Sequence, residues 1–376
     1  MWYNNADLLY RAKMLLLPLQ VAGDDTSSGG IMDIRNILAE AAAICGPSGH
    51  EMDIAAYFAE KFRPFTDEVK VDAMHNVIAH KKGTGPKVML AAHLDEIALL
   101  VTKIEDDGSL RLGMVGGVDP RILPGSRVWV HGKEKLFGTI GALPPHLMSA
   151  EDRQNNYQLK NLHVDLGMTA ERVKEQVKIG DLVTLDDRAT ELLNHQFACK
   201  TMDDRACVTL LLCAAEYLQK LHCDADVYFV ATSQEEVGSR GAETAAFAID
   251  PDLAIALDVD HATIPGSRPD STVPGDKLAV SVGPYIQPKL CDRLLDCAKE
   301  HNAALTVTVA GRSTATDADE IGLTRGGVPT VLLSLPLKYM HTSVETIDLR
   351  VLKEGGRLLA HFVSELDAGW EEDLWI

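Results

Sequence analysis

The chain has 376 residues, of which 46% are hydrophobic and 24% are charged, as expected for a globular protein with a sizeable core. The net charge of −19 argues against a nucleic-acid partner, because no excess of basic residues is available to neutralise phosphates. The 7 cysteines form no C-x-x-C pair, which fits a reducing cytoplasm better than a disulfide framework.

The first 31 residues differ in character from the rest. Residues 8–21 are mostly apolar, but Arg11, Lys13 and Pro18 interrupt them, so we predict no membrane span here. Residues 26–30 have the Ser/Gly composition of a flexible linker. We therefore predict a disordered extension over residues 1–31, with the folded chain beginning near Met32.

Two helices and a buried strand follow this extension. Apolar residues at helical spacing predict a helix over residues 32–45, and Ser48 with Glu51 resembles a capping box for the next helix. After short strands at 69–73 and 77–81, residues 88–97 form an apolar run that ends in polar groups. An H-x-D pair at a strand end favours a metal-binding histidine, because the Asp can fix the imidazole tautomer.

From residue 101 to 187 the pattern of apolar and turn-forming residues changes. Short β-type segments, such as 127–131, 136–140 and 181–185, alternate with Gly/Pro turns, and one helix is predicted over 169–177. This pattern is typical of a small β-rich module inserted into an α/β domain.

A second group of acidic residues follows the module. Asp203 and Asp204 precede an apolar helix predicted over 206–221; Asp203 alone could be an N-cap, but a cap does not require two consecutive acids. The apolar strand that starts at Val227 then delivers Glu235 and Glu236. Two unpaired carboxylates at the end of a buried strand are costly unless a cation lies beside them.

The last third of the chain also contains buried strands that end in or precede polar residues. A buried strand over 253–260 carries Asp258, and an apolar strand over 328–335 precedes His341 before a closing helix over 349–366. Strands that alternate with helices predict an α/β fold with a mixed, mainly parallel sheet sandwiched by helices.

Seven polar residues lie at strand ends and loop–helix junctions: His93, Asp95, Asp203, Glu235, Glu236, Asp258 and His341. Imidazoles and carboxylates suit Zn, Co or Mn, and these ligands are too many for one catalytic zinc ion. They suit two divalent metals that share a carboxylate and a bridging water or hydroxide, with one unligated acid left to move the proton. The chemistry predicted is hydrolysis.

Five motifs occur in order: H-x-D at 93–95, M-D-D-R at 202–205, E-E-V-G-x-R-G-A at 235–242, D-V at 258–259 and Y-M-H-T-S-V-E at 339–345. They resemble the co-catalytic, dinuclear metallo-aminopeptidases, in particular the cytoplasmic tetrahedral (TET), glutamyl and deblocking aminopeptidases. The resemblance covers residues 32–366. It implies a zinc-peptidase-like catalytic domain over 32–100 and 188–376, with residues 101–187 as the inserted module.

The resemblance also implies roles for single residues. Asp203 would bridge two divalent metal ions per subunit. His93 and Asp258 would complete one metal site, and Glu236 and His341 would complete the other.

The resemblance gives the two remaining acids roles other than metal binding. Glu235 would be the general base, and Asp95 would orient the metal-binding histidine. Family members remove single residues from peptides with a free N-terminus and assemble into dimer-based homo-oligomers, often tetrahedral dodecamers.

The sequence departs from the family pattern near the expected substrate position. Asp260 stands where relatives commonly have Thr, and Lys338, Thr342 and Ser343 replace the usual Arg, Ser and Pro. The turn before Asp317 is also unusual. No ligand position is lost, so these changes concern specificity; Asp260 would favour basic N-terminal residues if it faces the substrate.

Two other interpretations remain open at this point. A metal-dependent deacylase of N-acyl amino acids would use the same hydrolytic groups. Some relatives are labelled endoglucanases, but the ligand set does not favour that activity, and aromatic residues for sugar platforms make up only 5% of the chain.

Overall fold

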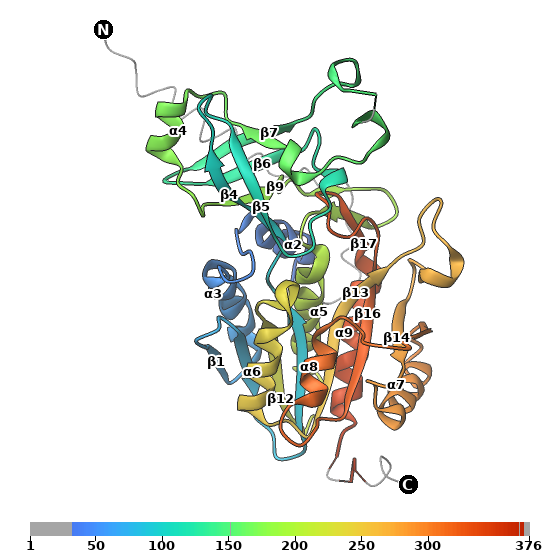
Figure 1. Cartoon of the computed structure of the whole chain (residues 1–376). Helices are drawn as coiled ribbons and strands as arrows, with labels where there is room; N and C mark the ends of the chain where they lie inside the picture. Colours follow the sequence, from blue (N-terminus) through green and yellow to red (C-terminus); the bar gives the residue numbers. More distant parts are fainter. Residues whose placement is uncertain (1–31, 151, 368, 372–376) are drawn as a thin grey trace. The chain divides into compact units, whose positions relative to one another are not determined.

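The computed structural model describes residues 32–150, 152–367 and 369–371. The extension predicted over residues 1–31 lies outside the described residues. From Ile34 onward the chain forms one compact unit, which contains a large helix-covered sheet and a closed β-barrel (Figure 1). The prediction of a mixed α/β fold is confirmed.

The strands of the large sheet, in spatial order, are β1 (Glu68–Val71), β2 (Val77–Lys81), β12 (Asp226–Thr232), β3 (Lys87–His93), β13 (Leu253–His261), β16 (Thr330–Leu337), β14 (Leu278–Val282) and β15 (Leu305–Val309). The four central strands, β12, β3, β13 and β16, run parallel to one another. Antiparallel pairs join β1 to β2, β2 to β12 and β14 to β16. The central strands are buried along most of their length, as their continuous apolar runs predict.

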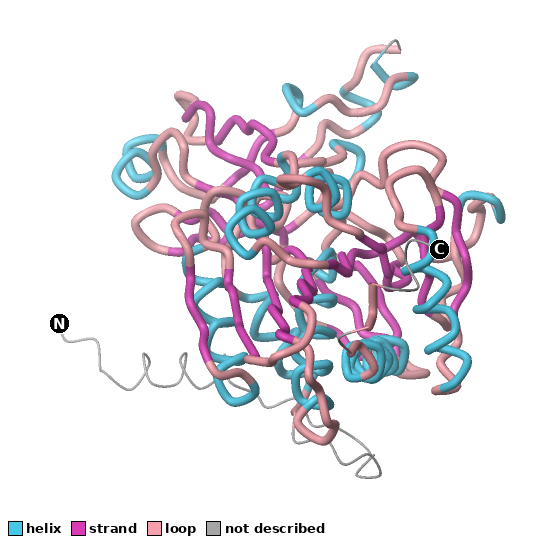
Figure 2. The backbone as a smooth tube through the Cα atoms, turned by 90° about the horizontal axis from the view of Figure 1, so that it is seen from below, coloured by secondary structure: helices cyan, strands magenta, loops and turns pink. Residues whose placement is uncertain are grey.

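The helices that accompany this sheet are α2 (Ile34–Ala43), α3 (Met52–Phe62), α5 (Met202–Leu218), α6 (Arg240–Ile249), α7 (Pro288–Glu300), α8 (Asp317–Leu323) and α9 (Leu349–Ser364). Helices α5 and α9 pack on each other and on the central strands, while α6 and α8 form a second pair. Figure 2 shows helices on both sides of the strands. Although α5 is buried almost throughout, the described part of the chain contains no helix both long and apolar enough to span a bilayer.

The closed barrel consists, in spatial order, of β4 (Ala98–Ile104), β5 (Leu110–Val115), β8 (His163–Asp165), β7 (Lys135–Gly141), β6 (Arg127–His131) and β9 (Leu182–Leu185). Burial alternates along β6 and β7, because successive side chains point into the barrel and out of it. Val128, Val130 and Ile140 belong to its apolar core. The helix α4 (Ala170–Gln176) lies between β8 and β9 in the chain. The module boundaries at residues 101 and 187 stay a prediction.

A third, small sheet joins the two halves of the chain. It contains β10 (Thr190–Glu191), β11 (Gln196–Cys199) and β17 (Glu345–Asp348). The pairing of β11 with β17 sets Cys199 opposite Glu345. This register brings the segment that leads into α5 next to the segment that follows β16.

Candidate metal centre

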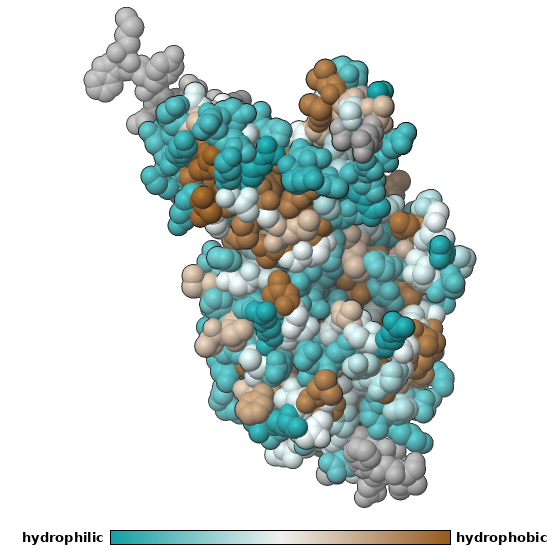
Figure 3. All heavy atoms as spheres, viewed as in Figure 1, coloured by the Kyte–Doolittle hydropathy of each residue, from teal (hydrophilic) through white to brown (hydrophobic). Residues whose placement is uncertain are grey.

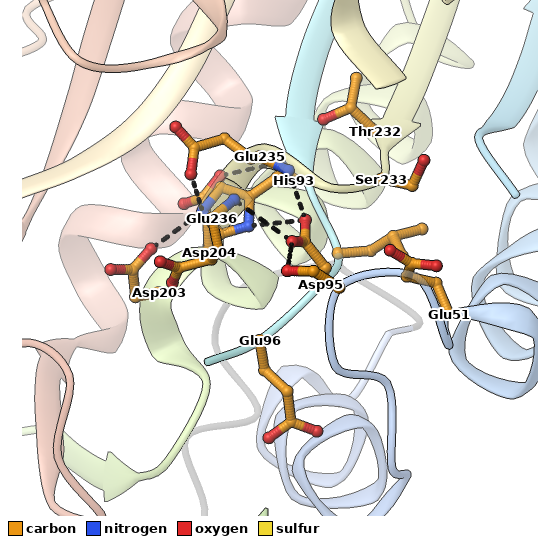
Figure 4. A network of polar contacts seen from close by, with 12 residues as sticks. Glu51, His93, Asp95, Glu96, Asp203, Asp204, Thr232, Ser233, Glu235 and Glu236 are labelled. Carbon is orange, nitrogen blue, oxygen red and sulfur yellow. Dashed lines mark hydrogen bonds and ion pairs between the residues drawn. The ribbon is translucent and has the colours of Figure 1, made fainter. Parts of the chain in front are cut away.

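The predicted site residues meet at the carboxyl edge of the parallel strands. His93 ends β3 and lies opposite Thr232, the last residue of β12. Asp258 lies in β13, opposite Ser334 in β16. Open α/β sheets place ligands outside this edge, because the loops that follow parallel strands converge there. Figure 4 shows the resulting network of carboxylates around His93.

The carboxylate of Asp203 lies between two imidazoles. Its Oδ1 is 3.0 Å from Nε2 of His93, and its Oδ2 is 3.2 Å from Nε2 of His341. The same Nε2 of His341 is 3.2 Å from Oε1 of Glu236. Each oxygen of one carboxylate therefore points toward a different histidine, which is the arrangement that a metal-bridging carboxylate needs.

Asp203 occupies this position because it is not part of the regular helix. It was open to interpretation as an N-cap, but its two carboxylate oxygens lie against the imidazoles of His93 and His341. Asp203 and Asp204 have non-helical backbone angles, and the regular helix begins only after them. The carboxylate of Asp203 is thus turned toward the histidines instead of the backbone N–H groups of the first turn. The N-cap interpretation is wrong.

Asp258 lies close to His93 in a second group of candidate ligands. Atoms of His93, Asp204 and Asp258 that can ligate a metal lie within 4.8 Å of one another, as do those of His93, Asp203 and Glu236. His93 belongs to both groups. The structure therefore places two candidate ligand sets side by side, and all of their carboxylates are less than one-tenth exposed.

Asp95 fixes the turn that carries the two glutamates. Its carboxylate accepts hydrogen bonds from the backbone N–H of Glu235 at 3.0 Å and of Glu236 at 3.3 Å. Its Oδ1 is also 3.5 Å from Nδ1 of His93. Asp95 thus contacts the ring that it was expected to orient, and it also holds the adjacent acid pair in place.

The hydroxyl of Ser48 donates a 2.6 Å hydrogen bond to Asp95. The capping box predicted for Ser48 and Glu51 is therefore wrong: Glu51 itself takes the N-cap position of α3, without a side-chain cap bond. The physical reason is that a buried carboxylate needs donors, and the Ser48 hydroxyl supplies one.

His341 is held by two groups that sequence reasoning did not assign. Its Nδ1 donates to the carbonyl of Gly117 at 2.9 Å, which leaves Nε2 free to act as a ligand. Its backbone N–H donates to Oε1 of Glu345 at 2.7 Å, and Oε2 of Glu345 accepts from the N–H of Asp203 at 3.1 Å. Glu345 thus links the two ligand-bearing segments, although its place in the motif at 339–345 gave no hint of this contact.

A buried ion-pair network supports the beginning of α5. Oε1 of Glu96 is 3.2 Å from Arg205, and its Oε2 is 2.5 Å from Nζ of Lys200. Arg205 also donates to the carbonyls of Ala41 and Leu94. The arginine of the M-D-D-R motif therefore ties the Asp203 segment to the end of β3. The sequence showed the motif but not this role.

The electrostatics of the site indicate a need for cations. Burial, with a contribution from the negative charge of neighbouring carboxylates such as Asp258, raises the pKa of Glu235 to about 10. Burial likewise raises the pKa of Asp258 and of Glu236. Burial opposes the charged form of His341, but contacts with Asp203 outweigh this effect and raise its pKa to about 11. So many buried acids around two imidazoles stay ionised only if additional positive charge is present.

A buried polar atom without a partner supports the same conclusion. Within the described residues, Oδ1 of Asp204, in the group with His93 and Asp258, is buried and has no hydrogen-bond partner. Such atoms are rare in native structures, because an unpaired polar group loses the hydration energy that it has in water. The presence of this atom beside imidazoles and carboxylates fits divalent metals, whose preferred ligands are these groups.

The contact between Gly117 and His341 gives a testable prediction. A Cβ at residue 117 would lie 3.0 Å from Cε1 and 3.1 Å from Nδ1 of His341. Gly117→Ala should displace the imidazole and weaken metal binding about 10-fold, as expected when the outer partner of a metal-binding histidine is disturbed. Titration against a competing chelator measures this affinity.

Gly141→Ala is the matched control, because nothing lies within 4 Å of a Cβ at that barrel position. Equal metal affinity in the two alanine variants would show that the contact with Gly117 does not position His341.

Comparison with known proteins identifies related chains. Residues 75–358 match the M42 glutamyl aminopeptidase profile. A lysyl aminopeptidase from Pyrococcus furiosus is 39% identical over 328 residues, which cover 85% of this chain and 94% of the relative.

Solved structures agree with this match. An aminopeptidase from Desulfurococcus kamchatkensis superposes with a TM-score of 0.84 and 33% identity, over 92% of this chain and 99% of that one. The TET1 peptidase of Pyrococcus horikoshii, which can assemble into a tetrahedron or a large octahedral shell, superposes with a TM-score of 0.77 and 30% identity, over 89% of this chain and 100% of that one.

Proposed function

Because this chain belongs to the M42 glutamyl aminopeptidase family and is a peptidase, we propose that it is a dinuclear metal-dependent aminopeptidase that removes single residues from peptide N-termini. The observation that carries the proposal is the placement of Asp203 between His93 and His341. A carboxylate with an imidazole at each oxygen is suited to hold two cations at once.

In the proposed ligand set, Asp203 would hold both metals. His93 and Asp258 would complete one site, and Glu236 and His341 would complete the other. Zn, Co and Mn all suit this donor set. When bound, such metals polarise the substrate carbonyl and lower the pKa of water.

Glu235 supplies the proton chemistry in this proposal. Its Oε2 is 3.8 Å from Nε2 of His93, and its backbone is fixed by Asp95. This position lets Oε2 take a proton from the attacking water and pass it to the leaving amine. Glu235 is thereby kept as the one unligated acid of the pair.

We further propose a preference for basic N-terminal residues. Asp260 follows Asp258 by two positions in β13, so both side chains project from the same face of the sheet. Among the described residues Asp260 pairs with no Lys or Arg, and it accepts only the backbone N–H of His261, at 2.7 Å. The 39% identical relative is named for lysyl substrates, which agrees with this charge. Thr342 lines a cavity together with Asp203 and Glu236, so the departures near His341 also lie beside the site.

The test is hydrolysis of matched peptides with N-terminal Lys, Glu or Leu, each offered with a free and an acetylated amine. We expect turnover of the free peptides only, and fastest turnover for Lys. Asp260→Asn should narrow the gap between Lys and Leu. Hydrolysis of acetylated substrates would instead identify a deacylase, and equal rates for Lys and Glu would contradict the proposed specificity.

The chain is also proposed to form a homo-oligomer, as its TET relative does. Large apolar side chains are exposed on the barrel strands, at Met114 and Phe137, and on the connections between strands, at Leu143, Leu147 and Ile179. Figure 3 shows hydrophobic residues on the barrel face in that view. Such exposed apolar groups mark interaction surfaces when they gather. A monomeric mass in light scattering would contradict this proposal.

A further inference from the structure

A second cluster of metal-binding residue types lies on α7 and α9, apart from the strand ends that build the candidate active site. Cys297 and His301 are four residues apart at the end of α7, and His361 and Glu365 are four residues apart at the end of α9. Residues at this spacing share one face of a helix. The two helices pack against each other, so the two pairs meet.

The side chains of this cluster are close enough to share one ion. Ligand atoms of Cys297, His301 and Glu365 all lie within 4.8 Å of one another. Nε2 of His301 is 2.5 Å from Oε1 of Glu365. The rings of His301 and His361 stack with their centroids 3.7 Å apart and 14° between their planes, which fixes the orientation of His301.

We propose that Cys297, His301 and Glu365 form a binding site for a divalent transition metal such as zinc or cobalt, outside the catalytic centre. A thiolate, an imidazole and a carboxylate are the common ligands of four-coordinate zinc. His361 is a positioning residue that packs on the liganding ring, and a water molecule completes the coordination.

The geometry requires a small adjustment. Bond lengths to zinc of about 2.0–2.3 Å at tetrahedral angles separate neighbouring ligand atoms by about 3.3–3.6 Å. The contact between His301 and Glu365 must therefore open by about 0.8 Å when an ion enters. The side chain of Glu365 is 40% exposed, so it can move at the rim of the site.

Without an ion, the same residues form a hydrogen-bonded pair above a buried thiol. Cys297 is 4% exposed, and burial together with Glu365 raises the pKa of the thiol to about 12. A metal ion would displace the thiol proton to solvent and take its place. A simple ion pair would not require a sulfur atom at this point, whereas a metal site would use it as its strongest ligand.

Cobalt provides a readout that is specific to this cluster. The proposed active-site ligands contain no sulfur, so a thiolate-to-cobalt charge-transfer band in the near ultraviolet would come from another site. The full-length protein, stripped of metal and then saturated with Co²⁺, should show this band. It should also bind one more cobalt ion per chain than Cys297→Ser does.

Three variants act as controls. Cys291→Ser removes another buried thiol of α7, which points to the carbonyl of Ser281, and should keep the band. Cys207→Ser removes the thiol that lies 3.4 Å from the carbonyl of Asp258 and should keep it as well. Asp203→Asn should retain the band even if the active site loses its metals, which separates this proposal from the catalytic one.

The absence of the band from the cobalt-saturated protein would overturn the proposal, as would its survival in Cys297→Ser or its loss in Cys207→Ser. If Cys297→Ser does not fold, Glu365→Gln at the exposed rim replaces it. This variant should bind the additional cobalt ion at least about 10-fold more weakly than the unmodified protein. Unchanged affinity in Glu365→Gln would contradict the site equally.

Discussion

Glu235→Gln should lower kcat by roughly 10²–10⁴-fold while both active-site metals stay bound, because the variant loses the general base and no ligand. Glutamine matches glutamate in size, and the backbone N–H of residue 235 can still donate to Asp95. The amide cannot accept and release a proton as the carboxylate does. Its loss therefore acts on turnover and leaves the metal site intact.

The measurement combines metal analysis with steady-state kinetics on one protein preparation. Glu243→Gln, at an exposed position in the first turn of α6, is the matched control and should keep full activity. Glu236→Gln should differ from both, because it removes a proposed ligand and should lower metal content. If Glu235→Gln kept near-normal turnover, another group would have to be the base.

Sequence reasoning located the strands of the catalytic region because burial leaves a clear pattern. The apolar run of residues 88–97 ends in polar groups, and the structure ends β3 at the first of them, His93. A charge directly after such a run is costly unless a partner compensates it. That cost made His93, Glu235 and Asp258 visible as candidates without any structure.

The barrel was harder to define from sequence. β8 has only 3 residues, and β6 pairs with β9, which lies far along the chain. Short strands carry weak periodicity, and barrel closure depends on contacts between distant segments. The sequence therefore indicated a β-rich module but could not predict which strands pair.

The supporting residues of the site were missed for a related reason. Glu345 contacts the backbone of Asp203 across 142 positions of sequence, and Gly117 contacts His341 across 224. Neither contact follows from local pattern. Ser48 even gave a misleading signal, because its spacing to Glu51 matched a capping box while its hydroxyl bonds to Asp95.

Asp203→Asn should remove metal from both positions and abolish most activity. In the structure the charge of Asp203 faces both imidazoles, and despite burial these contacts hold the pKa of its carboxyl below the usual range. The asparagine amide carries no charge, and its NH₂ group, a hydrogen-bond donor that cannot ligate a cation, would face one of the two metal positions. Affinity at both positions should fall by at least about 10²-fold, which exceeds the loss expected from an outer-sphere change.

The decisive comparison is with Glu236→Gln, measured by metal content per folded chain after dialysis at a fixed free metal concentration. Oε1 of Glu236 is 3.2 Å from Nε2 of His341, and the proposed ligand set uses Glu236 in the His341 site alone, so its loss should empty one position and spare the other. Asp203→Asn should empty both in a chain that keeps its circular dichroism spectrum. Two bound metals in Asp203→Asn would mean that the carboxylate between the imidazoles is not a bridge, and that His93 and His341 bind independent ions.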